Sequence, residues 1–234
     1  MLSVIGYGFV FVNYFFNKTK DIEISLIGIF GLFIIYLISS FTHILVPHEY
    51  IHNFVVICLG LIMLYLNRMS LQKNHFKIII FMFILLFTGF LITKTNEDFP
   101  YYHLPMSLQL VYNNLQFGLG NLSVAYNHFS SIFFINSVFY LPITKHFLFN
   151  LINYLFQIFF FSHLIILFIN KSKISLFSTL LLSLTACIFI LKFYRLAEYG
   201  VDMPGQLLVS LSIILISIIL FNNFSDELKI RYYY

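Results

Sequence analysis

The chain has 234 residues, of which 60% are hydrophobic and only 9% are charged, too few polar groups to coat a water-soluble domain of this length. Its net charge of +4 comes from basic residues scattered between apolar segments, which excludes a nucleic-acid-binding surface. Cys58 and Cys187 each lie inside an apolar segment, which excludes a disulfide framework and a zinc site. We therefore predict an integral membrane protein whose partner is the lipid bilayer.

Seven apolar segments are candidate membrane spans, because a hydrocarbon core of about 30 Å needs roughly 20 residues of helix. The first is the shortest, and its Gly6 and Gly8 allow close helix packing. Helices are expected because they satisfy every backbone hydrogen bond within lipid. We predict an all-α transmembrane bundle forming one domain over residues 1–234, with spans at about 2–16, 25–46, 51–66, 76–93, 147–169, 174–191 and 204–221.

The basic residues between these segments predict the orientation, because Lys and Arg favour cytoplasmic connections. If the segments alternate in direction, nine of the thirteen basic residues fall on one side. The pattern predicts an external N-terminus and a cytoplasmic C-terminus. The nine are Lys18, Lys20, Arg68, Lys73, Lys77, Lys171, Lys173, Lys229 and Arg231, and the other four are Lys94, Lys145, Lys192 and Arg195.

The connection over residues 94–146 is the longest and is external in this topology. Connections longer than about 15 residues are usually functional or disordered, and the abundance of Tyr, Phe and Leu argues against disorder. Leu108, Val111 and Leu115 recur at helical spacing, and Pro105 suits a first helical turn. We predict short helices lying in the membrane interface.

An acidic cluster opens this connection. Glu97 and Asp98 are followed by Tyr101, Tyr102 and His103, so candidate base, metal ligand and hydrogen-bonding groups lie within a few residues. We predict that the two carboxylates are catalytic or bind a divalent metal, and that the other three bind substrate. The alternative is that these acids are simply solvated, or that Asp98 shapes a turn or caps a helix.

A second cluster lies between the last two predicted spans. Glu198 and Asp202 are four residues apart and share a face if the segment is helical, while Arg195 can pair with either or hold a phosphate. We predict that all three bind substrate, although Asp202 near Pro204 also suits a helix start. Both clusters fall on one side of the membrane, so their carboxylates can meet over one cavity that suits a divalent metal.

Several histidines are also candidates for chemistry. His128, in the long connection, can hydrogen-bond a polar ligand, although a water-exposed loop histidine is the commoner case. His43, His48 and Glu49 are interpreted as part of an interfacial turn. His163 lies inside the fifth span, where an ionisable group is costly, and we expect a neutral, hydrogen-bonded imidazole there.

The stretch Asn96–Pro105, with its acidic pair, resembles the acidic first-loop motif of GT-C type glycosyltransferases. The resemblance implies a bacterial inner-membrane enzyme that uses a polyprenyl-phosphate sugar, with Asp98 as catalytic base or metal ligand and Glu97 beside it. In that family the pair generally follows the first span and the chains are longer. The resemblance therefore implies extra helices in front of the motif and an N-terminal part of a longer enzyme.

Two other functions stay open. A transporter or lipid-binding module needs polar residues between its spans, and Asn150, Asn153 and Gln157 share roughly one face of the fifth span. The same three residues also suit hydrogen bonds between helices. The third possibility is a structural subunit without chemistry of its own. For the enzyme, Lys192 or Arg195 can offset charge on a leaving phosphate.

Overall fold

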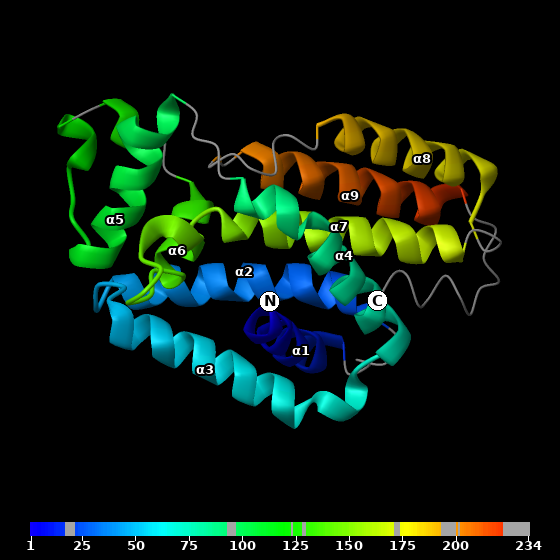
Figure 1. Ribbon diagram of the computed structural model, residues 1–234, viewed down its shortest axis with the longest axis horizontal. Helices are drawn as coiled ribbons and strands as arrows, with labels where there is room; N and C mark the ends of the chain where they lie inside the picture. The colour runs from blue at the N-terminus through cyan, green and yellow to red at the C-terminus, as the bar shows by residue number, and fades with distance from the viewer. Residues whose placement is uncertain are drawn as a thin grey trace.

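The long helices of the protein lie side by side, with short helices gathered at one end (Figure 1). The computed structural model describes residues 1–16, 22–92, 97–122, 124–127, 130–170, 174–192, 200 and 202–221. These ranges contain helices and no β-strand, apart from an isolated bridge between Leu141 and Lys145. The predicted all-α helical bundle is confirmed.

Seven apolar helices make up the body of the bundle. Within the described ranges, four helical stretches are long and apolar enough to cross a membrane: α2, α4, α9 and residues 146–169, which include α7. The remaining three are shorter. An integral membrane protein follows, while the count of seven spans stays a prediction. The helices are α1 (Leu2–Phe16), α2 (Ile24–His43), α3 (Tyr50–Leu66), α4 (Lys73–Leu91), α7 (Leu151–Ile169), α8 (Leu176–Leu191) and α9 (Asp202–Phe221).

Helix α7 forms the centre of the molecule. It contacts α2, α4, α6, α8 and α9, and residues on all its sides are buried, including Ile152, Tyr154 and Phe159. A helix that is apolar all round and enclosed by neighbours is typical of a membrane-protein core. Helices α3, α4 and α8 instead expose large apolar side chains, as expected of surfaces that face lipid.

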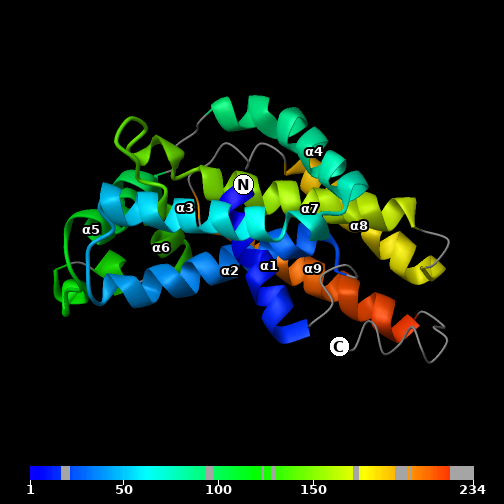
Figure 2. The same ribbon diagram turned by 90° about the horizontal axis from the view of Figure 1, so that it is seen from below.

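Helix α1 crosses α2 and α3 instead of running alongside them (Figures 1 and 2). A Cβ atom built on Gly6 would lie 1.8 Å from the carbonyl oxygen of Gly60, and one on Gly8 would lie 1.8 Å from that of Ile27. These positions therefore need glycine, because any side chain would separate the backbones. The close packing expected of Gly6 and Gly8 is present, and it belongs to a crossing helix.

The short helices α5 (Leu104–Tyr112) and α6 (Ser131–Val138) lie at what we call the loop end, on the left of Figure 1. Helix α5 has Pro105 in its first turn, as expected, but it ends at Tyr112, and Leu115 lies beyond it and is exposed. The predicted helix was therefore too long at its C-terminal end. Helix α6 starts where the Ser130 side chain accepts a hydrogen bond from the Ile132 amide.

Candidate functional site

The acidic segment is divided between water and the protein interior. Phe99–His103 forms a π-helical turn that leads directly into α5. Glu97, Asp98 and Tyr101 are exposed, whereas His103 is only 6% exposed. The Asp98 side chain makes no capping hydrogen bond, so helix capping does not explain it. The structure thus directs the two carboxylates outward and the imidazole inward.

Tyr102 connects the two predicted acidic clusters. Burial raises the pKa of its hydroxyl, and the negative charges of Asp98 and Asp202 raise it further. One acid from each cluster therefore acts electrostatically on the same hydroxyl group, although more than a hundred residues separate the two acids in the chain.

A cavity of about 790 Å³ lies between α8 and α9, beside Asp202. Its polar residues at the loop end include Lys192, whose Nζ donates a hydrogen bond to Gln206 Oε1 at 3.2 Å. Further along the two helices its walls are mainly apolar, formed by Ile188, Phe189 and Val209 among others. The cavity therefore has one cation and one anion at its loop end, and an apolar lining along the rest of its length. Asp98 is not among the lining residues, whereas Asp202 is.

A second, much smaller cavity of about 10 Å³ lies between the acidic segment and α6. His103, Ser107 and Asn136 contribute polar atoms to its lining, and Gly200 borders it from the connection before α9. Asn153 Nδ2 donates a hydrogen bond to Gly200 O at 2.9 Å. This bond holds the start of the second acidic region against α7, next to the first.

Three predicted site residues, Arg195, Glu198 and His128, lie outside the described residues. In the part of the chain that the structure describes, no group of three or more His, Cys, Asp or Glu side chains is arranged to hold a metal ion. A divalent cation normally takes six or more oxygen ligands. Asp98 and Glu97 thus do not form a metal site with the other described residues, and metal binding there stays a prediction.

No protein-family model, curated protein or solved structure matches this chain. The resemblance to GT-C glycosyltransferases therefore rests on the acidic motif itself. Of that motif, Asn96 lies outside the described residues, and residues 97–105 form the turn and the start of α5.

A histidine network joins α2, α3 and α6, which sequence reasoning did not anticipate. Asn53 Nδ2 donates to the carbonyl oxygens of His48, Ser137 and Tyr140 at 2.8 to 2.9 Å. His48 Nε2 lies 3.0 Å from the carbonyl of Ser39, so Nε2 donates. Nδ1 of the neutral ring lies 2.6 Å from Ser137 Oγ, whose single hydroxyl proton is shared between this nitrogen and the carbonyl oxygen of Phe134 at 2.8 Å.

The second ring of the network has a defined tautomer as well. Asn53 Oδ1 must accept from His52 Nδ1 at 3.0 Å, because the amide nitrogen of Asn53 is already a donor. His52 Nε2 then accepts from the Thr42 hydroxyl at 2.9 Å. Burial and the neighbouring His52 and His43 lower the pKa of His48 to about 3. His48 is therefore neutral, and the side chains of His48, His52 and Asn53 all have hydrogen-bond partners, so the evident role of the network is structural.

The polar residues of α7 have two kinds of environment. His163 Nδ1 lies 2.7 Å from Glu23 Oε2, so the imidazole has the hydrogen-bond partner that was expected, and this partner is a carboxylate. The side-chain amides of Asn150 and Gln157 are buried and have no hydrogen-bond partner among the residues that the structure describes. Interhelical hydrogen bonds were the expected alternative for this face. Among the described residues, Asn153 donates to the carbonyl oxygen of Gly200, which lies in the connection before α9.

Proposed function

We propose that the protein is a GT-C-like membrane glycosyltransferase, which transfers a sugar from a polyprenyl-phosphate donor to an acceptor at the loop end. We place that end on the non-cytoplasmic side of a bacterial inner membrane, with the N-terminus outside and the C-terminus inside. One observation carries the proposal: Asp202 and Lys192 line one cavity with mainly apolar walls, and the charges of Asp202 and Asp98, from two separate connections, both raise the pKa of the Tyr102 hydroxyl.

The two carboxylates face different solvents, which suits a reaction between a lipid and a water-borne acceptor. Asp202 lines the cavity between α8 and α9, whose apolar walls fit a polyprenyl chain. Asp98 is exposed to water, from which an acceptor hydroxyl approaches. The donor thus enters from the membrane and the acceptor from the aqueous side.

The chemistry assigned to these residues is a single displacement. Asp98 takes the proton from the acceptor hydroxyl, the acceptor oxygen bonds to the anomeric carbon, and the bond from that carbon to the phosphate oxygen breaks. The lipid phosphate leaves as an anion, and Lys192 offsets its charge. Glu97, Tyr101, Tyr102 and His103 are proposed to orient the acceptor. Arg195, Glu198 and His128 are proposed as further binding residues.

The test is a transfer assay in membranes with a tritiated, short-chain polyprenyl-phosphate hexose. We expect Asp98→Asn to lower transfer about 100-fold, because general base catalysis is typically worth that much, and Asp98→Glu to retain part of the activity. Protein level is checked by immunoblot. Unchanged transfer in Asp98→Asn removes that residue from the mechanism, and no transfer by the parent protein contradicts the proposal.

One observation favours a second candidate, a transporter. The unpartnered amides of Asn150 and Gln157 lie inside the bundle, where a transported polar solute would find hydrogen-bonding groups. Uptake of labelled hexoses into proteoliposomes tests this function. We expect Gln157→Leu to abolish such uptake while leaving sugar transfer unchanged, and uptake that is equal in both proteins rules out a role for Gln157.

A further inference from the structure

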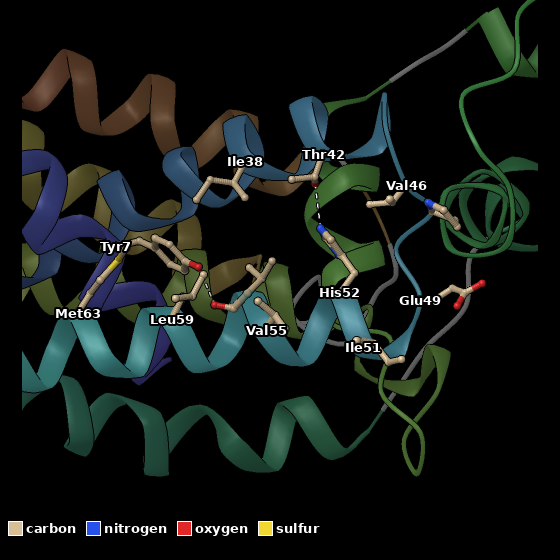
Figure 3. Close-up of a pocket in the computed structure, with 12 residues that line it drawn as sticks. Tyr7, Ile38, Thr42, Val46, Glu49, Ile51, His52, Val55, Leu59 and Met63 are labelled. Carbon is tan, nitrogen blue, oxygen red and sulfur yellow. Dashed lines mark hydrogen bonds between the residues drawn. The ribbon is translucent and has the colours of Figure 1, made fainter.

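A groove of about 580 Å³ runs along α3, on the side that faces α2. Figure 3 shows Ile38 and Thr42 of α2 on one side, and His52, Val55 and Leu59 of α3 on the other. Tyr7 of α1 closes the far end, where its hydroxyl donates to Val56 O at 2.6 Å. The groove is thus a feature of the three N-terminal helices, separate from the cavity between α8 and α9.

The open side of the groove faces lipid. Ile51 is 78% exposed and Leu59 45% exposed, and both lie on an apolar helix of a membrane protein. From Ile51 to Met63 the lining extends for about 18 Å at 1.5 Å per helical residue. One leaflet contributes about half of a 30 Å hydrocarbon core. The groove therefore has the length and the lining of a site for one lipid chain.

The polar end of the groove carries a negative charge. Thr42 and His52 also lie there, but they are hydrogen-bonded to each other at 2.9 Å. Glu49 is exposed, and its side chain makes no capping bond with α3. Of the residues that line the groove in the described structure, Glu49 is the charged one. A carboxylate at this end favours a cationic headgroup and repels an anionic one.

We propose that this groove binds one phospholipid whose headgroup carries a primary ammonium, with an acyl chain against Val55 and Leu59 and the ammonium beside Glu49. The cavity between α8 and α9 differs from this site because it contains a cation, Lys192, as well as the anion Asp202. The proposal does not depend on the glycosyltransferase function.

The test is native mass spectrometry of the delipidated protein in detergent. Phosphatidylethanolamine and phosphatidylglycerol with the same acyl chains are the probes. We expect at least fivefold more of the ethanolamine lipid to be retained as a 1:1 complex. Glu49→Gln should remove this preference while leaving chain binding intact. If the parent protein retains the two lipids equally, or retains neither of them, the proposal is overturned.

A filled groove gives an independent check. Leu59→Trp places a larger ring in the groove and should reduce retention of the ethanolamine lipid about fivefold. Ile84→Trp is the matched control, because Ile84 on α4 is also an exposed apolar residue and does not line the groove. Equal losses in the two variants, or no loss in Leu59→Trp, overturn the proposed location. Size-exclusion profiles verify that both variants fold.

Discussion

Two polar regions of the protein contain similar residue types but differ in how their side chains are paired. In the histidine network, the rings of His48 and His52 and the amide of Asn53 exchange hydrogen bonds that tie three helices together. In the acidic region, Asp98 and Asp202 are exposed, and Asp202 borders a cavity. A network of paired polar side chains stabilises the fold, whereas exposed charge beside a cavity is available to a ligand.

The largest effect is expected at the centre of the histidine network. Asn53→Ala removes the donor shared by three carbonyl oxygens, of which Ser137 O keeps the Tyr140 amide as a donor. The two oxygens left unpaired should lower the free energy of unfolding by about 3 kcal/mol. Thermal unfolding in detergent measures the change. The exposed Asn114→Ala is the control and should shift stability by less than about 0.5 kcal/mol. Equal effects of the two variants would contradict the structural role of the network.

Substitutions in the acidic region should have a large effect on activity and a small effect on stability. Asp202→Asn is expected to lower sugar transfer about 100-fold, because a carboxylate in the donor cavity stabilises the positive charge that develops on the sugar in the transition state. The thermal unfolding midpoint should change little, because the side chain is exposed. The transfer assay and the unfolding scan are run on the same preparation. A large loss of stability together with activity would mean that Asp202 serves the fold.

Acid should weaken the histidine network specifically. Because the pKa of His48 is lowered to about 3, the folded protein keeps this ring neutral while the unfolded chain binds a proton below its ordinary value of about 6.5. The stabilising contribution is full above pH 6.5 and is lost as pH falls towards 3, by up to about 1.4 kcal/mol per pH unit.

Measurement of this pH dependence is cleanest between pH 7 and 5, where carboxylates stay ionised. The difference in unfolding midpoint between pH 7 and pH 5 should be smaller in His48→Gln than in the parent protein. His52 and His43 face the same ring, so they are left unchanged in both proteins. An identical pH response in the two proteins would contradict the lowered pKa of His48 as the cause of the acid sensitivity.

The smallest effect is expected at Lys192. Lys192→Gln should reduce transfer about tenfold, less than a buried donor would, because a partly exposed ammonium is screened by water. Lys145→Gln is the control, since Lys145 lies in the turn before α7 and does not line the cavity. Both variants are measured with the labelled lipid donor at low and high salt, and a tenfold loss in Lys145→Gln would remove the specific role of Lys192.

The helical fold was predictable because runs of apolar residues long enough to form helices in lipid are visible in the sequence. The crossing of α1 was not, because it depends on Gly60, Gly31 and Ile27 in other helices. The end of α5 was also misjudged, since Leu115 continues the helical spacing but lies outside the helix.

The candidate site was predictable in part. The expectation that both acidic clusters share one side of the membrane stays a prediction, while the charges of Asp98 and Asp202 both act on the Tyr102 hydroxyl. The histidine network was missed, because His48 and Ser137 are 89 residues apart and no local pattern pairs them. The same holds for His163 and Glu23, which are 140 residues apart. Pairs of this kind depend on helix packing, which spacing along the chain does not reveal.

The bond between Asn153 and Gly200 has a practical consequence for the acidic region. It joins an uncharged amide to an uncharged carbonyl, so neither ionic strength nor proton concentration alters its partners. The anchoring of the chain two residues before Asp202 should therefore persist in dilute buffer and in concentrated salt alike. Any salt sensitivity of the proposed sugar transfer would then reflect how the charged lipid donor binds, because the position of the chain at Gly200 stays the same.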